Sequence, residues 1–278
     1  MGTLNDYRDR PHWSYSAVNQ FFNICSLQFA FQRIYKIHPA FTPVALAFGS
    51  VFHRVAEWMF LTLKEGKIPE AKSASDLFNE LWQRQQAEND NIRFDEEITA
   101  ETCAIQGRDL VACLAANIDP TEKVLAVNMP FAVPLIDMQG NVLEVPMIGE
   151  LDYVVEKEGK PIIGDWKSAA RRWPKFKAKH DLQPTVFLYA YRQLTGIMPG
   201  FRFDVVVKNK TPVFERHETE RTDSAFHRMV ELVKLAEDMV QHEHFCPNEQ
   251  GFYCGSCPYH GACDNWHQNY ARHISLAA

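Results

Sequence analysis

Two acidic residues interrupt apolar runs in the middle of the chain, and a lysine follows the second acid. Asp152 lies in the run 149–156, and Asp165 lies in the run 161–167, two residues before Lys167. Two carboxylates a few ångström apart repel each other unless a cation lies between them, and a divalent ion with oxygen ligands is the natural occupant. A lysine beside that ion can orient an attacking water and stabilise charge that develops on phosphorus. The pattern therefore predicts metal-dependent hydrolysis of a phosphate ester.

These side chains can act together only if they project from one face of a hairpin. If Glu158-Gly159 forms a two-residue turn, Asp152 lies opposite Asp165 and Glu150 lies opposite Lys167. Because side chains alternate between the faces of a strand, all four then share one face. A register shifted by one residue would separate the two aspartates. The alternative is a solvated strand face with a Glu150 to Lys167 salt bridge, which contributes little stability.

Three cysteines crowd into ten residues near the carboxyl end: Cys254, Cys257 and Cys263. Such crowding predicts a shared metal centre, for which a fourth ligand is needed. The chain has seven cysteines, an odd number that suits reduced thiols or metal thiolates better than a disulfide framework. Cys103 and Cys113 lie in an apolar helical pattern and are predicted to be small core residues.

The elements that must position these residues follow an α/β pattern. Helical periodicity predicts helices near 14–35 with Cys25 inside, 48–64, 74–88, 96–118, 184–196 and 224–244. β-Branched runs between turn signals predict a three-stranded meander over 123–168 and two further strands near 201–208 and 212–218. Neither repeats nor linkers divide the chain, so we expect one domain.

The motifs resemble those of the PD-(D/E)XK nucleases. Asp152 followed by Asp165-Trp166-Lys167 is similar to the bipartite motif of that superfamily, and Gly49-Ser50-Val51-Phe52-His53 is similar to the Gly-x-x-x-His signature of its RecB-like members. Gln183 takes the place of the glutamine in the Gln-x-x-x-Tyr helix, but Phe187 replaces the tyrosine.

The resemblance implies a restriction-endonuclease-like core, in which helices flank a mixed central sheet. It implies one nuclease domain over 1–278, with a helical insertion at about 66–120 and a cluster-binding tail at about 246–270. The catalytic residues would be Asp152, Asp165, Lys167 and Gln183. The ligands of Mg²⁺ or Mn²⁺ would be His53, Asp152, Asp165 and the carbonyl of Trp166, and the nitrogen ligand is compatible with Mn²⁺.

The same branch, including AddB-type and CRISPR-adaptation nucleases, carries one cysteine before the Gly-x-x-x-His helix and three at the carboxyl end. This order implies a 4Fe-4S cluster on four cysteines: Cys25, Cys254, Cys257 and Cys263. Structural zinc is the competing metal, and in a zinc site His260 or Cys246 could replace Cys25. Otherwise Cys246 is expected to be a free thiol.

The segment after Lys167 interleaves basic and aromatic residues, with five residues expected to contact DNA: Arg171, Arg172, Trp173, Lys175 and Lys177. Phosphate contacts combined with base stacking suit single-stranded DNA. The alternative is an ordinary solvated loop. The formal net charge of −6 gives no general attraction to nucleic acid, so the prediction depends on this segment.

The combined prediction is a metal-dependent exonuclease that hydrolyses single-stranded DNA or DNA ends, in recombination, repair or phage or CRISPR DNA processing. A non-catalytic DNA-binding or assembly module with the same fold is the alternative. A zinc-stabilised protein of unrelated purpose would leave the hairpin acids unexplained. The polar amino terminus contains no signal peptide or membrane span, and we expect a cytoplasmic protein without membrane contact.

Overall fold

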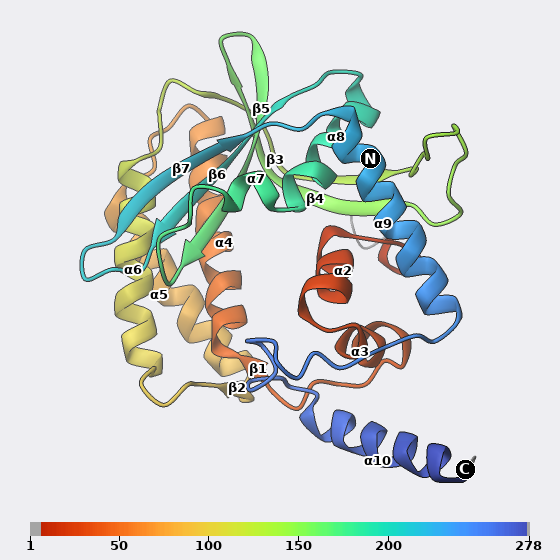
Figure 1. The fold of residues 1–278 in the computed structure, drawn as a ribbon. Helices are drawn as coiled ribbons and strands as arrows, with labels where there is room; N and C mark the ends of the chain where they lie inside the picture. The colour runs from red at the N-terminus through yellow and green to blue at the C-terminus, as the bar shows by residue number, and fades with distance from the viewer. Residues whose placement is uncertain (1–6, 277–278) are drawn as a thin grey trace.

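A five-stranded mixed sheet forms the centre of the computed structural model, which describes residues 7–276 (Figure 1). The strands follow chain order across the sheet: β3 (Lys123–Val133), β4 (Met147–Lys157), β5 (Lys160–Ala169), β6 (Gly200–Val207) and β7 (Val213–Thr219). Neighbouring strands are antiparallel except β5 and β6, which are parallel. A parallel pair needs a crossover connection, and helix α8 (Gln183–Thr195) lies in it. The predicted meander and mixed sheet are confirmed.

The β4–β5 hairpin has the predicted register. Its ladder runs from the pair Lys157 and Lys160 to the pair Tyr153 and Gly164. Glu158 and Gly159 form the two-residue turn with φ of 53° and 75°, the left-handed values that such hairpin turns require. This register places Asp152 beside Asp165 where the ladder ends.

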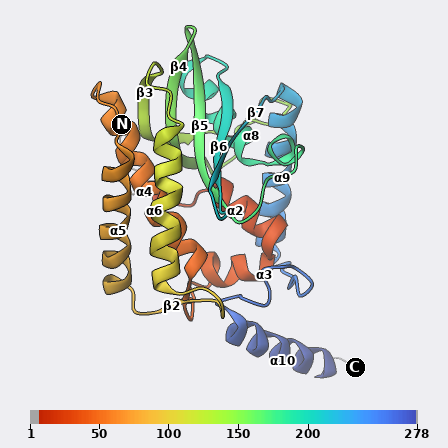
Figure 2. The same ribbon diagram turned by 90° about the vertical axis from the view of Figure 1, so that its left-hand side faces the viewer.

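Helices cover both faces of the sheet (Figures 1 and 2). One face packs against three helices: α4 (Val44–Lys64), α5 (Ala71–Glu88) and α6 (Ala100–Ala116). The other packs against α8, α9 (Asp223–Gln241) and the short α2 (Tyr15–Asn19). Strand alternation separates the two cores, since Ile163 of β5 packs with α8 and α9 whereas Trp166 packs with α4.

The N-terminal helical segment is broken at Cys25, so the prediction of one helix containing this residue was wrong. π-Helical backbone over Gln20–Ile24 follows α2, Cys25 is extended with φ of −171°, and α3 (Ser26–Phe29) begins anew. The C-terminal tail stabilises the break, because Asn248 Nδ2 donates a hydrogen bond to the carbonyl of Ile24 at 2.9 Å. Local periodicity cannot reveal a partner from the other end of the chain.

After α9 the chain forms an irregular tail that ends in α10 (His260–Leu276), a helix that was not predicted. Two short strands, β1 (Thr42–Pro43) and β2 (Ile92–Arg93), pair in parallel near this tail, and α7 (Lys177–His180) precedes α8. By length and composition, α4 is the one helix among the described residues that could cross a membrane. Its apolar face, including Val51, Phe52 and Val55, is buried in the protein core.

Tyr153 fixes the end of the hairpin from the α4 side. Its ring stacks on Trp166 at 5.1 Å and lies over Gly164, where a Cβ would come within 1.7 Å of the ring. The Tyr153 hydroxyl donates a hydrogen bond to Asp204 (2.6 Å) and accepts one from Arg202 Nε (2.9 Å). The β6 and β7 strands, to which no chemistry was assigned from the sequence, therefore anchor the segment that carries Asp165 and Lys167.

Candidate active site

The carboxylate of Asp165 lies at the centre of the site and is inaccessible to solvent. It projects from β5 toward α8, where Gln183 Nε2 donates a hydrogen bond to its Oδ1 at 2.5 Å. Its Oδ2 lies 2.6 Å from Lys167 Nζ. Residues two apart on a strand share a face, which brings the acid and the lysine together. Lys167 is therefore paired with Asp165. The solvated-face alternative required it to pair with Glu150 instead.

Asp152 connects the hairpin to α4. Its Oδ2 lies 3.3 Å from His53 Nδ1 and accepts a hydrogen bond from the Trp166 backbone N–H at 3.1 Å. The predicted side chains from α4, β4, β5 and α8 thus meet in one place. Trp166 contributes its backbone to this place, while its buried ring packs into the core beneath. The roles assigned to these residues, including the Trp166 carbonyl as a ligand, remain predictions.

The two aspartates differ in their affinity for protons. Burial, followed by the negative charge of Asp152, raises the pKa of Asp165 to about 7, although Lys167 and His53 act against this rise. Burial also acts to raise the pKa of Asp152, but the hydrogen bond to His53 and the charges of His53 and Lys167 outweigh it and lower that pKa. At neutral pH one carboxylate is ionised and its neighbour exchanges its proton readily.

Among the side chains that the structure describes, those of residues 7–269, no three His, Cys, Asp or Glu are grouped so that they could hold a metal ion. In the acidic site the protein's own donors engage the carboxylates, through Lys167 and Gln183 on one side and His53 on the other. The donor set nevertheless fits a divalent cation, which would relieve the repulsion that holds a proton on Asp165. Gln183 Oε1 is a buried acceptor without a hydrogen-bond partner and adds an oxygen to this set.

Tyr15 and Asp181 also border the site, and neither was predicted. Asp181 Oδ1 accepts a hydrogen bond from the Gln183 N–H at 2.9 Å and so caps the start of α8. The Tyr15 hydroxyl bonds to Asp181, and burial followed by the charge of Asp181 raises the pKa of Tyr15. Asp181 could have been found from its capping position two residues before Gln183. Tyr15 carried no such signal, because its partner lies far along the chain.

Of the residues expected to contact DNA, four are exposed on the loop after β5 or at the start of α7: Arg171, Arg172, Lys175 and Lys177. The fifth, Trp173, is half-buried, because its ring packs edge-on against Phe203 at 4.9 Å and lies under Lys177 Nζ at 4.1 Å. Arg172 pairs with Glu215 at 3.3 Å. Phosphate contact fits this segment, whereas base stacking does not fit Trp173.

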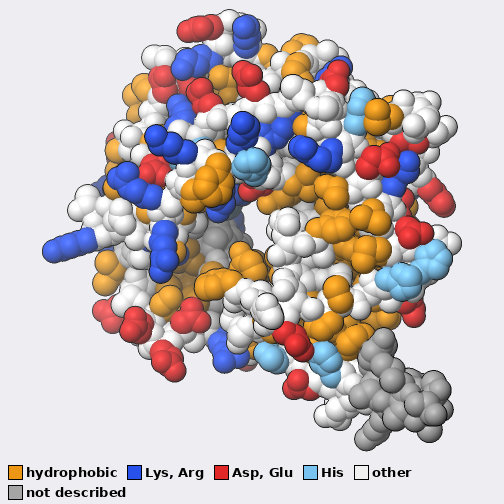
Figure 3. Space-filling view, in the orientation of Figure 1, with side chains coloured by type: hydrophobic (Ala, Val, Ile, Leu, Met, Phe, Trp, Pro, Cys, Tyr) orange, Lys and Arg blue, Asp and Glu red, His pale blue; other side chains and the backbone are white. Residues whose placement is uncertain are grey.

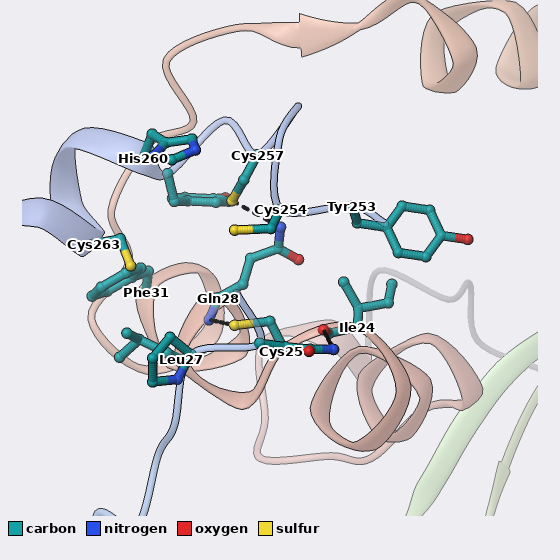
Figure 4. A pocket seen from close by; sticks show the side chains of 13 residues that line it. Ile24, Cys25, Leu27, Gln28, Phe31, Tyr253, Cys254, Cys257, His260 and Cys263 are labelled. Carbon is teal, nitrogen blue, oxygen red and sulfur yellow. Dashed lines mark hydrogen bonds between the residues drawn. The ribbon is translucent and has the colours of Figure 1, made fainter. Parts of the chain in front are cut away.

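The four cysteines from opposite chain ends line one cavity of about 40 Å³ (Figure 4). Cys25 lies at the helix break, where its Sγ accepts a hydrogen bond from the Gln28 N–H at 3.4 Å. The Gln28 amide stands between the thiols and donates a hydrogen bond from Nε2 to Cys257 Sγ at 3.3 Å. His260 lines the same cavity, and Cys246 lies outside it. The break at Cys25 therefore serves to aim its thiol toward the tail.

The thiols influence one another electrostatically. Burial, followed by the charges of Cys25, Cys254 and Cys257, raises the pKa of Cys263 to about 11. Repulsion between thiolates thus favours the protonated thiols in this cavity, and the soft metal centre on these cysteines stays a prediction. Cys103 is buried against the α4 core, as predicted, and Cys113 packs at its edge.

The hairpin acids, the lysine and the mixed sheet flanked by helices are consistent with a nuclease that has a restriction-endonuclease-like core. The chain belongs to the PD-(D/E)XK nuclease superfamily, because the model of that family matches residues 12–264.

Solved structures agree with the fold. The crystal structure described as "Putative exonuclease" from Eubacterium rectale is 15% identical to the chain, covers 92% of each chain and superposes with a TM-score of 0.59. SSO0001 is 10% identical, with 84% of this chain and 82% of that chain covered, and its TM-score of 0.39 is too low to support an inference. The curated proteins contain no match to the chain.

The raised pKa of Asp165 predicts a pH-dependent stability. In metal-free protein, Asp165→Asn should raise the free energy of unfolding by about 1 to 3 kcal/mol at pH 8 and leave it nearly unchanged near pH 4. The unfolded chain ionises this carboxyl near its usual pKa of 3.8, whereas the folded protein holds the proton to about 7. The free energy of unfolding of the wild type should therefore fall as the pH rises from 3.8 to about 7. Asparagine cannot ionise, so the variant should not show this fall.

Urea unfolding in the presence of a chelator at both pH values measures the difference. The exposed Asp109→Asn on α6 is the matched control and should show no such pH dependence. An Asp165→Asn effect of equal size at pH 4 and pH 8 would contradict the ionisation argument.

Proposed function

We propose that this protein is a divalent-metal-dependent DNA exonuclease that acts on single strands or DNA ends. The observation that carries the proposal is the meeting of Asp152, Asp165, Lys167 and His53 at the end of one hairpin, in a chain of the PD-(D/E)XK superfamily. A protein that used this fold only as a scaffold would have no need for a buried acid and lysine in contact. We also assign the chain to the RecB-like branch, from His53 on α4.

The proposed chemistry is hydrolysis of a phosphodiester. His53, Asp152, Asp165 and the Trp166 carbonyl would hold Mg²⁺ or Mn²⁺, which supplies Lewis-acid stabilisation of the phosphate and a more acidic bound water. Lys167 orients the attacking water and stabilises negative charge as it develops on the phosphate oxygens. Gln183 holds Asp165 in place, and Asp181 fixes the start of the helix that carries Gln183.

DNA would approach through the face shown in Figure 3. This face is hollowed between α4 and α2, and Lys and Arg side chains gather over β6, β7 and α7 on one side of the hollow. The exposed cations Arg171, Lys175 and Lys177 belong to this region. Cations placed there can contact phosphates while the overall charge of the protein stays negative.

The direct test is incubation of purified protein with end-labelled single- and double-stranded DNA, with Mg²⁺, Mn²⁺ or a chelator. We expect metal-dependent shortening of the strand from an end, and no loss of label with chelator. A covalently closed single-stranded circle, which offers no end, should be resistant. Wild-type protein that binds DNA but leaves every substrate intact would support the non-catalytic module instead.

We further propose that Cys25, Cys254, Cys257 and Cys263 hold a 4Fe-4S cluster. The proposal is supported by their shared cavity, and the half-buried Gln28 side chain would turn aside to admit a cluster. The cluster would be structural, because it would join the N-terminal segment to the tail.

Protein purified without oxygen should be brown, with thiolate-to-iron absorption and iron and sulfide in equal amounts. Cys254→Ser should lose iron and yield less soluble protein, because binding of the cluster contributes to folding free energy. Cys246→Ser, outside the cavity, is the matched control and should keep its iron. Colourless protein with one zinc per chain would contradict the cluster, and full stability of Cys254→Ser would contradict its structural role.

A further inference from the structure

Two neighbouring aromatic residues on the tail are exposed to solvent without an assigned role. Phe252 is 93% exposed and Tyr253 is 56% exposed. Their rings lie 5.7 Å apart at an interplanar angle of 83°, so ring faces remain open on each side chain. An exposed phenylalanine loses apolar contact with protein and gains nothing from water. Such a residue is expected to meet a ligand with an apolar surface.

The tail holds these rings in a fixed place. The Gly251 N–H donates to the Asn248 carbonyl at 3.0 Å, and the Cys254 N–H donates to the Gly251 carbonyl at 2.9 Å, so the residues before and after the pair are in tight turns. Asn248 is bonded to the helix break at Ile24. Cys254 points into the cysteine cavity whereas the Tyr253 ring points away from it (Figure 4). The pair is thus presented outward from an anchored segment.

The tail that carries the pair borders the hollow in the molecule. In the orientation of Figures 1 and 3, the tail borders the hollow from below, opposite the sheet and α7. Tyr253 lines the cavity together with Ile24, in the segment that follows α2, the helix that begins with Tyr15. Tyr15 bonds to Asp181, whose next contact is Gln183, the partner of Asp165. Contacts therefore join Tyr15 to the catalytic acid, through Asp181 and Gln183.

We propose that Phe252 and Tyr253 form a stacking platform for the bases of the single strand whose backbone enters the catalytic hairpin. The proposal rests on the nuclease function proposed above and assigns it a substrate form. Stacking is available only to bases that are unpaired, so the platform selects single-stranded DNA or a frayed end. The phosphates are contacted from the opposite side of the hollow, by the basic segment after β5.

A nucleobase fits the pair better than a protein partner does. A stable protein interface buries about 800 Å² on each side. The residues that flank the pair in the chain are small or polar, including Gln250, Gly251, Gly255 and Ser256, so they add little apolar surface to the two rings. Two open rings beside a nucleic-acid path match the size of one or two stacked bases.

The test compares binding of two fluorescent oligonucleotides with the same number of phosphates. One is a 20-mer of thymidine, and the other is the same 20-mer with abasic sites in place of every base. Anisotropy is measured on the iron-loaded protein with Ca²⁺ or a chelator in place of the catalytic metal, so that binding is read independently of cleavage. Phe252→Leu removes the ring but keeps an apolar side chain.

We expect wild type to prefer the thymidine strand, and Phe252→Leu to bind that strand at least about fivefold more weakly while binding the abasic strand unchanged. Phe252→Trp should retain the preference. The exposed Ile68→Ala, in the loop between α4 and α5, is the control for loss of an apolar surface residue. The double variant Arg171→Ala and Arg172→Ala should bind both strands more weakly by the same factor, so that the preference for the thymidine strand is kept.

Equal affinity of wild type and Phe252→Leu for thymidine would overturn the proposal, and so would a loss that is the same for both strands. Iron content measured on each variant shows whether the cluster is intact. Wild type that prefers thymidine but cleaves no DNA would refute the nuclease function and leave the stacking platform standing. Wild-type protein that cleaves DNA but binds the thymidine and abasic strands equally would refute the stacking platform and leave the nuclease function standing.

Discussion

Asp152→Ala is expected to lose metal-dependent DNA cleavage by roughly a thousandfold or more, because the change removes a carboxylate from the proposed metal site. It also leaves His53 and the Trp166 N–H without their shared acceptor. The fold should survive, since the side chain lies at the end of the hairpin ladder and contributes no apolar packing. Single-turnover cleavage of end-labelled DNA measures the loss, and circular dichroism with a thermal midpoint checks the fold.

The matched control is Asp109→Ala on the exposed side of α6, which should cleave as wild type does. Isothermal titration with Mn²⁺ should show loss of metal binding in Asp152→Ala only. Cleavage at the wild-type rate in a folded Asp152→Ala protein would refute the site.

Lys167→Ala is expected to lower the chemical rate by about a hundredfold or more, the effect of losing one electrostatic or proton-transfer contributor. Metal and DNA binding should be nearly unchanged, because the ammonium lies beside the site on the face of Asp165 and outside the predicted ligand set. Loss of the positive charge also favours the protonated form of Asp165. The rate should therefore be compared at pH 8.5 with saturating Mn²⁺, where the acid is ionised in both proteins.

The double variant Arg171→Ala and Arg172→Ala provides the contrast. It should weaken DNA affinity and flatten its dependence on salt, while single-turnover chemistry at saturating DNA stays unchanged. Lys167→Ala should thus be defective in single-turnover cleavage, and the double arginine variant should be defective in DNA binding. Lys167→Ala with weaker affinity and unchanged turnover would make the lysine a phosphate anchor and refute its proposed role.

The hairpin could be predicted because its determinants are local. A glycine at 159 allows the tight turn, the turn fixes the register, and strand alternation then decides which side chains share a face. The same holds for α8, which ends at Gly196 with φ of 74°. Spacing in the sequence was sufficient for these features, since each depends on residues close together in the chain.

The features that escaped prediction depend on distant partners. Cys25 interrupts a segment with good helical periodicity because the tail supplies hydrogen bonds to the break. The packing of Trp173 against Phe203 of β6 likewise joins residues that are distant in the sequence, while its predicted contact with DNA stays a prediction. Tyr15 reaches Asp181 only after the sheet has brought α2 and α8 together. In each case tertiary packing overrides a sound local expectation.

The position of the four thiols in the chain sets an order during synthesis. Cys25 leaves the ribosome before the residues from His53 to Gln183, and its partners at 254, 257 and 263 leave it after them. A fragment that stops before residue 254 would carry every predicted catalytic side chain, yet the segment that holds Tyr15 would have no tail to fasten it. Proteases should attack such a fragment first at its unfastened amino-terminal helices. Such a fragment is therefore expected to be degraded faster than a chain that includes residues 254–263.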